Sequence, residues 1–509
     1  MSQLKAAWAA YAARLAVLAG WRADLAAAAL GLLSAAALPP IHAIPALLLA
    51  LPGLIVLIGA SRGPAMAARR GWWFGWGAGI LGLYWITDAI LLRAAEFWWL
   101  VPIAVPGLAA VLAVFVAIPA AIAWFAAPGW PRVLVLAGGW TLADLARQFV
   151  LTGFPWNLWG SVWAVPGPAG DVMIQPAALV SAHGLTLATL VAASFPVLGR
   201  RWRTGIAVLL AAWAGFGAVR LAADPPSRTD LQVVIVQGDV AEGLKWNQAL
   251  ALRIFARYLA LTEQAVGRLH AGSPAVVVWP ETASPFLLQT DKAARDAVAR
   301  AASGAVALVG AVRFDQANRP RNSLFAIEPD ASVAAIYDKR HLVPFGEYEP
   351  SWLPLAFAVD AAGGFAPGAG SSTLSVPGMP PAGALICYEA IFPGQVVDRA
   401  ARPDWLVNVT NDAWFGNSSG PRQHLAAARM RAVEEGLPLM RAANTGISVG
   451  FDANGRELGR IGLDQAGTLT LALPKPLPPT PFARSGLWIP FGLSVMALGL
   501  GAVRWGIAR

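Results

Sequence analysis

The chain has very little cysteine and histidine. Cys387 is the single cysteine among 509 residues, so no disulfide can form within the chain. A lone thiol cannot be mispaired internally, which is compatible with an oxidising compartment. The five histidines are scattered, and none stands in a metal-binding spacing such as H-E-x-x-H. The sequence therefore favours neither a metal site nor a Cys–His pair, and we expect no cofactor.

Charge is also scarce, and it is unevenly distributed. Charged residues make up 13% of the chain and hydrophobic residues 57%, whereas a soluble domain usually carries about 25% charge. Only six of the 29 acidic residues lie in residues 1–224. The formal net charge of +9 suggests a nucleic-acid partner. We reject that interpretation because the basic residues fall between hydrophobic segments, as the topology of a membrane protein requires.

Long apolar segments dominate the first half of the chain. A helix that crosses a bilayer needs about 20 mostly apolar residues. By this measure we expect spans near 24–40, 43–60, 72–92, 99–127, 131–150, 173–197, 204–222 and 486–506. The prediction is a membrane domain of about seven helices at 1–222, a soluble domain at 223–480, and a C-terminal membrane helix at 481–509.

The basic residues orient these spans, because cytoplasmic flanks of membrane helices are enriched in Lys and Arg. A cytoplasmic N-terminus puts twelve such residues inside: Lys5, Arg14, Arg22, Arg62, Arg69, Arg70, Arg132, Arg200, Arg201, Arg203, Arg504 and Arg509. The outer flanks then hold only Arg93, Arg147, Arg220 and Arg484. We therefore expect both termini in the cytoplasm and residues 223–485 outside it.

Two polar or aromatic features of the membrane segments suggest function. Asp144 and Arg147 are three positions apart, so they share one face of a helix and could form an ion pair. The alternative is that both mark a helix end at the interface. The aromatic stretch 153–160, Gly-Phe-Pro-Trp-Asn-Leu-Trp-Gly, is either an interface anchor or the rim of a lipid site.

From about residue 228 the pattern changes to short apolar strands that alternate with helices. We expect strands at 231–236, 275–279, 305–312, 322–328, 332–338, 383–388 and 404–409, with the last ones near 440–452 and 466–473. Helices are expected near 246–269, 290–302 and 421–437. Hydrophobic runs of this kind are typical of strands buried on both faces, so the fold class is α/β.

Three segments of this domain place ionisable residues where an apolar strand stops. Residues 276–278 lead to Glu281, and residues 384–386 lead to Cys387. The third segment carries Lys339 and Glu347 around a Pro/Gly turn. Ligand sites of α/β sheets form at such strand ends, although a lone cysteine is more often a small core residue.

A cysteine nucleophile needs a base and donors for the oxyanion, because a free thiol has a pKa of about 8.5 and attacks as the thiolate. No histidine is placed by a motif to be that base. The candidates that remain are Glu281 as base, Lys339 as the cationic stabiliser, and the backbone N–H of Tyr388 as a second oxyanion donor.

Together these segments resemble a known enzyme family. Three stretches are similar to the Glu-Lys-Cys set of the nitrilase superfamily: Trp279-Pro280-Glu281, Asp338-Lys339 with 341–347, and 386–389. Further matching stretches are 236–238, Lys245-Trp246, 411–416 (Asn-Asp-Ala-Trp-Phe-Gly) and 428–432 (Ala-Arg-Met-Arg-Ala). With membrane spans on both sides, the whole chain resembles the apolipoprotein N-acyltransferases.

The resemblance implies an αββα sandwich on the periplasmic side of a bacterial inner membrane and a two-step acyl transfer. Cys387 would take an acyl chain as a thioester from a phospholipid, phosphatidylethanolamine in particular. The N-terminal α-amine of a diacylglyceryl-cysteine on an apolipoprotein would then receive it, the final step of lipoprotein maturation. Carried over by motif, Glu281 is the base, Lys339 stabilises the oxyanion, and Glu347 and Glu389 support the site. We expect a monomer.

Other residues are expected to line the acyl pocket or to hold the triad: Tyr388, Trp246, Trp414 and Asn322. The alternatives are that the two tryptophans are ordinary core or interface aromatics and that Glu389 is only a structural partner of a cation. The Gly-flanked apolar segment 350–370 is either a mobile lid or a packed connection between strands.

Two other functions compete with acyl transfer. A membrane-tethered amidase of the nitrilase type would use the same three residues with water as acceptor, but one membrane anchor would suffice for it. A transporter or scaffold with an inert outer domain would not explain Glu281, Lys339 and Cys387 at matching strand ends.

Overall fold

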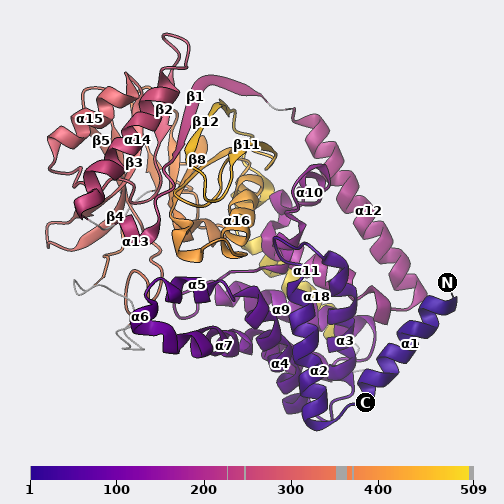
Figure 1. The fold of residues 1–509 in the computed structure, drawn as a ribbon. Coiled ribbons are helices and arrows are strands. Elements are labelled where there is room, and N and C mark those ends of the chain that lie inside the picture. Colours follow the sequence, from indigo (N-terminus) through magenta and orange to yellow (C-terminus); the bar gives the residue numbers. More distant parts are fainter. Residues whose placement is uncertain (1, 226, 246–247, 351–363, 370–371, 504–509) are drawn as a thin grey trace. The chain divides into compact units, whose positions relative to one another are not determined.

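The computed structural model describes residues 2–225, 227–245, 248–350, 364–369 and 372–503 (Figure 1). Contacts within the chain divide it into two compact units. Met1–Ala223 and Arg484–Arg509 form the first, which we call the helical unit; Asp224–Ala483 form the second, which we call the α/β unit.

The helical unit consists of helices joined by short turns. Its α-helices are α1 (Ser2–Ala16), α2 (Gly20–Ala35), α3 (Leu47–Gly59), α4 (Pro64–Gly82), α5 (Ile86–Leu91), α6 (Ala94–Phe97), α7 (Val101–Leu112), α8 (Val114–Phe125), α9 (Trp130–Arg147), α10 (Pro168–Met173), α11 (Ala177–Ala193), α12 (Arg200–Ala223) and α18 (Trp488–Ala502). Short 3-10 turns are η1 (Ile44–Ala46), η2 (Trp98–Leu100), η3 (Trp159–Trp163) and η4 (Phe195–Val197). Helix α17 (Pro481–Ser485) leads from the α/β unit into α18.

Two helical stretches among the described residues are long and apolar enough to cross a membrane, judged by length and composition. They are Ala94–Phe125, with 32 residues, and Arg200–Ala223, with 24. Three shorter apolar helices cover Ile44–Gly59, Ala177–Ala193 and Trp488–Ala502. All five coincide with segments that the sequence predicts as spans.

The expected span at 72–92 is wrong in its boundaries. Helix α4 begins at Pro64, a residue suited to the first helical turn, and it ends at Gly82. The expected span begins after the charged residues Arg69 and Arg70. In the structure both pair with Asp24 of α2, and Arg70 is buried. Because the charges are neutralised in this way, the helix continues through them.

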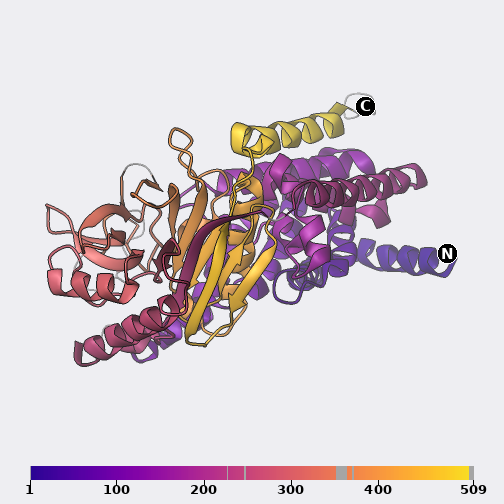
Figure 2. The same ribbon diagram turned by 90° about the horizontal axis from the view of Figure 1, so that it is seen from above.

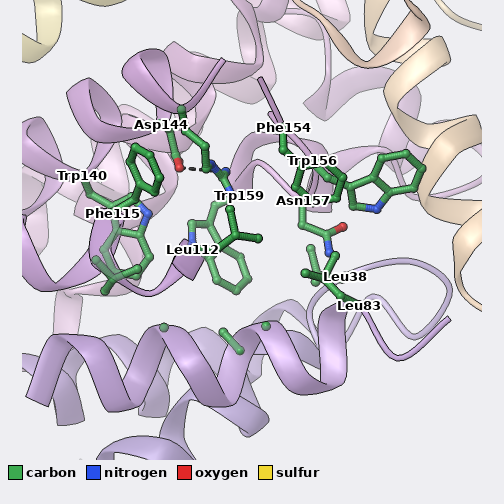
Figure 3. Close-up of a pocket in the computed structure, with 15 residues that line it drawn as sticks. Leu38, Leu83, Leu112, Phe115, Trp140, Asp144, Phe154, Trp156, Asn157 and Trp159 are labelled. Atoms are coloured by element: carbon green, nitrogen blue, oxygen red, sulfur yellow. Dashed lines mark ion pairs between the residues drawn. The ribbon is translucent and has the colours of Figure 1, made fainter. Parts of the chain in front are cut away.

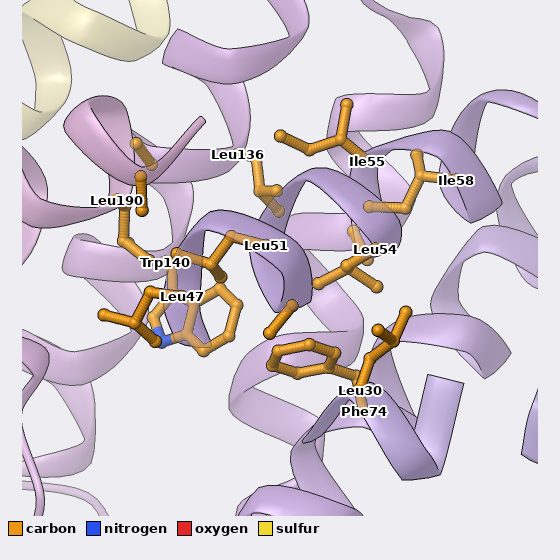
Figure 4. Close-up of a cluster of buried hydrophobic side chains, with 14 of the residues drawn as sticks. Leu30, Leu47, Leu51, Leu54, Ile55, Ile58, Phe74, Leu136, Trp140 and Leu190 are labelled. Atoms are coloured by element: carbon orange, nitrogen blue, oxygen red, sulfur yellow. The ribbon is translucent and has the colours of Figure 1, made fainter. Parts of the chain in front are cut away.

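Glycines allow the helices of this unit to approach closely. A Cβ added to Gly31 of α2 would lie 2.0 Å from the Phe74 carbonyl oxygen, and one added to Gly77 would lie 2.1 Å from the Ala28 carbonyl oxygen. Small residues at helix contacts are typical of membrane bundles, where van der Waals packing replaces the hydrophobic effect. Leucines and isoleucines of α3 fill the core between these helices, against Phe74 and Trp140 (Figure 4).

Within its described residues, the α/β unit contains two six-stranded sheets. The first has the order β12-β1-β2-β3-β4-β5, with bounds β12 (Gly467–Pro474), β1 (Arg228–Gln237), β2 (Ala275–Val278), β3 (Val306–Phe314), β4 (Pro320–Ile327) and β5 (Val333–Asp338). The second has the order β11-β10-β9-β8-β7-β6, with bounds β11 (Glu457–Ile461), β10 (Ser448–Phe451), β9 (Leu439–Ala443), β8 (Trp405–Thr410), β7 (Ala382–Ile386) and β6 (Thr373–Leu374). The view in Figure 2 shows the long strand β1 beside β12, its antiparallel partner.

The two sheets pack face to face, and helices cover their outer faces. Alternate residues of a strand point to opposite faces, so Val233 of β1 joins the core between the sheets together with Val407 of β8. Its neighbour Val234 packs outward against helices α14 (Ala251–Val266) and α15 (Lys292–Ala302). Helix α16 (Gly420–Glu435) covers the second sheet. This αββα arrangement is the expected sandwich.

Most expected strands are present, with differences at the end of the domain. The apolar run at 440–452 is a hairpin, β9 and β10, because the Asn444-to-Ile447 segment turns the chain. The short strands β6 and β11 were not predicted, since they are edge strands with little hydrophobic alternation. The short helix α13 (Glu242–Lys245) and the turn η5 (Gln248–Leu250) precede α14.

Candidate active site

The ends of strands β2, β5 and β7 bring the expected residues together. Glu281 follows β2, and Lys339 is the first residue after β5. Cys387 follows β7 directly and begins the 3-10 turn η6 (Cys387–Ile391). All three side chains are buried although they are polar, so each needs partners in the protein.

Lys339 lies between two carboxylates. Its ammonium Nζ is 3.1 Å from Glu281 Oε1 and 2.9 Å from Glu347, and the lysine side chain is only 1% exposed. The pKa of Lys339 is lowered by burial, but the negative charges of Glu281 and Glu347 outweigh this and raise it overall. The lysine is therefore held as a cation at neutral pH.

Two asparagines fix the carboxylate of Glu281. Asn322 of β4 donates from Nδ2 to Glu281 Oε1 at 2.7 Å and to Glu347 Oε1 at 2.9 Å. The backbone N–H of Asn411 donates to the other oxygen, Oε2, at 2.8 Å. Both oxygens of Glu281 accept hydrogen bonds, as an ionised carboxylate does.

Cys387 occupies a strained turn. Its φ is +50°, in the left-handed region that side chains other than glycine rarely adopt. Burial raises the pKa of the Cys387 thiol well above its ordinary value, the charge of Glu281 raises it further, and the Lys339 cation lowers it. Strain of this kind persists only where the surroundings hold it, and it is common at active sites. The thiol is therefore protonated at rest and requires a base before it can attack.

Glu389 ties the cysteine turn to the segment that carries Lys339. Its Oε2 accepts from the backbone N–H of Ile386 at 2.8 Å. Its Oε1 accepts from the Tyr337 hydroxyl at 2.7 Å and from the backbone N–H of Arg340 at 2.8 Å. Burial raises the pKa of Glu389, and these donors act against that shift.

A second polar chain approaches Cys387 from α16 and the second sheet. Arg441 Nη2 donates to Asp412 Oδ2 at 2.7 Å, Asp412 Oδ1 lies 2.9 Å from His424 Nδ1, and His424 Nε2 lies 3.0 Å from the Cys387 carbonyl oxygen. Cys387, Asp412 and His424 also bring potential metal ligands within 4.8 Å of one another. The Arg441 guanidinium already supplies the positive charge there, so we interpret the cluster as a hydrogen-bonded chain.

Comparison with known proteins identifies the family of this chain. The apolipoprotein N-acyltransferase N-terminal domain matches residues 30–195, and the carbon-nitrogen hydrolase family matches residues 236–477. The apolipoprotein N-acyltransferase of Rhodopseudomonas palustris is 39% identical over 503 residues, 92% of either chain. That of Bradyrhizobium diazoefficiens is 40% identical over 526 aligned positions, 96% of either chain. This chain belongs to the apolipoprotein N-acyltransferase family.

Among solved structures, a carbon-nitrogen hydrolase from Helicobacter pylori aligns with a TM-score of 0.37 and 17% identity. The alignment covers 55% of this chain and 94% of that one.

The other residues that the sequence predicts near the site lie in different environments. Tyr388 is buried and packs edge-on against Phe392, with ring centroids 5.1 Å apart. Trp414, in the turn η7 (Asp412–Phe415), is 37% exposed, so it is not a core aromatic. Trp246 lies outside the described residues, as do 351–363 and 370 of the expected lid. Asn322 contacts the carboxylates, which supports the interpretation that it holds the triad.

The helical unit contains a cavity of its own, whose lining includes the aromatic stretch 153–160. Trp140, Phe154, Trp156 and Trp159 line it together with apolar residues of α4, α7 and α8 (Figure 3). Asp144 and Arg147 are also part of the lining, and they form the expected ion pair at 2.8 Å. The ion pair is therefore confirmed, and Arg147 is also the last residue of α9, so the pairing does not decide between the two interpretations of these charges. Most residues that line the cavity are apolar, and the lining includes one charged pair.

No role in the site is predicted from the sequence for four residues that lie near it: Asn411, Asp412, His424 and Arg441. The first two belong to the Asn-Asp-Ala-Trp-Phe-Gly motif, in which only the tryptophan was predicted to be a site residue. His424 was set aside because it fits no metal or Cys–His motif. A histidine on a buried helix, 37 residues from the cysteine, gives no local signal, since only the fold brings it to Cys387.

Proposed function

We propose that this protein transfers a fatty acyl chain from a phospholipid to the N-terminal α-amine of an S-diacylglyceryl-cysteine on an apolipoprotein. The acyl chain passes through a thioester on Cys387. One observation carries the proposal: a cysteine in a left-handed turn stands beside a buried Glu281–Lys339 pair, in a chain that matches apolipoprotein N-acyltransferases over 92–96% of its length.

The first half-reaction forms the thioester. Glu281 takes the proton of the Cys387 thiol, and the sulfur attacks the ester carbonyl of the donor lipid. Lys339 and the backbone N–H of Tyr388 stabilise the oxyanion, a type of interaction whose loss costs about 10²–10³ in rate. The intermediate collapses, and the lysophospholipid oxygen leaves with the proton returned by Glu281.

The second half-reaction forms the amide. The α-amine of the acceptor attacks the thioester carbonyl, and Glu281 takes a proton from the attacking nitrogen. The same donors stabilise the second oxyanion. The Cys387 sulfur leaves, regains a proton from Glu281, and the enzyme returns to its starting state. This ping-pong order lets one site serve two lipid substrates in turn.

The family membership and the sequence support a proposal for the cellular setting. We propose that about eight spans hold the enzyme in a bacterial inner membrane, with residues 1–222 and 481–509 in the membrane domain. Residues 223–480 then form a periplasmic catalytic domain, and both termini are cytoplasmic. The protein acts as a monomer on phosphatidylethanolamine. Two lipid substrates explain the location, since extracting an acyl tail from a bilayer costs about 0.8 kcal/mol per CH₂.

Intact mass spectrometry tests the thioester. The protein is purified in detergent, incubated with phosphatidylethanolamine, and compared with Cys387→Ser and Glu281→Gln. We expect a hydroxylamine-labile fatty-acyl mass on the wild type that both variants lack. Glu263→Gln, on the exposed side of α14, is the matched control and should carry the adduct. A folded wild type without adduct, in the presence of the lipid, would contradict the proposal.

A lipopeptide acceptor separates acyl transfer from the amidase alternative. A diacylglyceryl-cysteine peptide with a free α-amine should gain one acyl chain and discharge the thioester. The same peptide with an acetylated amine should leave the thioester intact. Release of free fatty acid at equal rates with both peptides would instead indicate hydrolysis, with water as the acceptor.

A further inference from the structure

The carbonyl oxygen of Cys387 is held by a buried histidine. His424 Nε2 lies 3.0 Å from this oxygen, and the histidine side chain is fully buried on α16. A carbonyl oxygen can only accept, so Nε2 carries a hydrogen and donates it. Burial and the nearby Arg441 cation lower the pKa of His424, while Asp412 raises it. Nε2 donates to the Cys387 carbonyl in either protonation state: in the imidazolium Nδ1–H also donates to Asp412, and in the neutral ring Nδ1 accepts from Arg441.

The ring of His424 is itself fixed from behind. Asp412 Oδ1 lies 2.9 Å from Nδ1, and Arg441 Nη2 lies 3.2 Å from the same nitrogen. Arg441 also binds Asp412 at 2.7 Å, and Thr410 donates to Asp412 Oδ1 at 3.1 Å. All four side chains are buried, and a buried hydrogen-bonded network of this kind restricts the arrangement of its members.

The histidine therefore determines where the next N–H points. The C=O of Cys387 and the N–H of Tyr388 belong to one peptide group, which is planar and trans. In a trans peptide these two bonds point in opposite directions, so an anchor on the oxygen sets the direction of the N–H. A hydrogen bond to the carbonyl also polarises the peptide and makes its N–H a stronger donor.

We propose that His424 is a positioning residue for acyl transfer: it anchors the Cys387–Tyr388 peptide so that the Tyr388 N–H faces the oxyanion. This inference rests on the proposed function, in which that N–H is an oxyanion donor. Cys387 needs such an anchor because its φ of +50° is a strained conformation that the surroundings must hold. Asp412 and Arg441 act one step further back, on the orientation of the imidazole.

The test compares two reactions of the same thiol. Alkylation by iodoacetamide is a displacement at carbon that forms no oxyanion. Acylation by p-nitrophenyl butyrate attacks a carbonyl and forms one, and its nitrophenolate burst needs no phospholipid. We expect His424→Ala to alkylate within about threefold of the wild type, while its acylation burst slows by about 10²–10³, the cost of one oxyanion donor.

A matched pair of amides separates positioning from packing. Gln places an amide NH₂ near the position of Nε2, whereas Asn places it near Nδ1. His424→Gln should therefore recover acylation to within about tenfold of the wild type, and His424→Asn should behave like His424→Ala. Equal melting temperatures of the two amide variants would confirm that folding does not explain the difference.

Three outcomes would overturn the inference. One is acylation by His424→Ala at the wild-type rate. Another is a parallel loss of alkylation and acylation in all variants, which would indicate a structural role. The third is equal acylation by the Gln and Asn variants. If the ester burst depends on His424 but phosphatidylethanolamine gives no adduct on the wild type, the inference stands and the proposed donor is wrong.

Discussion

The backbone N–H of Asn411 donates to Glu281 Oε2 at 2.8 Å, although the two residues are 130 positions apart. Glu281 follows β2 of the first sheet, and Asn411 follows β8 of the second. The side chain of Asn411 in turn donates to Glu242 at 2.6 Å and accepts from Asn444 at 3.0 Å. The position of the proposed base is therefore set by both sheets, and the site exists only when the sandwich is assembled.

Removing the charge of Glu281 should make the thiol more acidic and at the same time slow acyl transfer. The negative charge of Glu281 raises the pKa of Cys387, and Lys339 lowers it. In Glu281→Gln the lysine keeps its partner Glu347 and remains a cation. We expect the pH profile of iodoacetamide alkylation to shift to lower pH, and the acylation rate to fall by about 10²–10⁴, the typical contribution of a general base.

The opposite change provides the control for this experiment. Lys339→Met removes the cation, so its alkylation profile should move to higher pH than that of the wild type. If both variants shift the profile in the same direction, their charges do not act on the thiol, and the proposed role of Glu281 is contradicted.

Asn322 is expected to be intolerant of a change that preserves its shape. Its Nδ2 donates to Glu281 at 2.7 Å and to Glu347 at 2.9 Å. In Asn322→Asp a third carboxylate would replace that donor and repel the other two. We expect acyl-enzyme formation to fall at least as much as in Asn322→Ala, by about 10² or more, since breaking a buried charged network costs several kcal/mol. Initial rates of thioester formation, measured beside melting temperatures, check this.

A result with the opposite order would be informative. Faster acylation in Asn322→Asp than in Asn322→Ala would mean that shape, and not donation, is what this position supplies. The substitution Asn318→Asp, in an exposed turn before β4, is the matched control and should leave the rate unchanged.

How far the sequence predicts this molecule depends on how local each signal is. The strand ends at Glu281, Lys339 and Cys387 each follow an apolar run, so their positions could be read locally, and the αββα class followed from the family resemblance. The boundaries of α4 could not be predicted locally, because the ion pair of Arg70 with Asp24 joins residues 46 positions apart. His424 and Arg441 were missed for the same reason, since their contacts with Asp412 and Cys387 are tertiary. The left-handed φ of Cys387 also has no signature, because no glycine marks it.

A buried carboxylate makes stability depend on pH. Burial raises the pKa of Glu435, at the end of α16, from 4.5 to about 7, and the charge of Glu434 adds to this while Arg402 opposes it. The folded protein therefore binds this proton more tightly than the unfolded chain does. The stabilisation is complete below pH 4.5 and is lost as the pH rises to about 7. A shift of this size corresponds to about 3 kcal/mol.

Melting temperatures of Glu435→Gln at pH 5 and pH 8 test this linkage. Glutamine cannot ionise, so the variant should gain stability relative to the wild type as the pH rises across this range. Glu263→Gln, which is exposed on α14, should follow the wild type at both pH values. A difference between Glu435→Gln and the wild type that does not change with pH would show that Glu435 does not titrate in this window.

The backbone strain at Cys387, the proposed nucleophile, should have a measurable effect on stability. Cys387 has a φ of +50°, and a residue with a Cβ pays about 1–2 kcal/mol in this region that glycine does not. Glycine loses about 0.5–1 kcal/mol of that advantage, because it makes the unfolded chain more flexible and so raises the entropy lost on folding. We therefore expect Cys387→Gly to be more stable than Cys387→Ala by about 0.5–1 kcal/mol. Ala384→Gly, in the neighbouring strand β7, is the matched control and should be destabilised. If glycine is the less stable residue at both positions, the turn is not strained, and the need of Cys387 for an anchor such as His424 disappears with it.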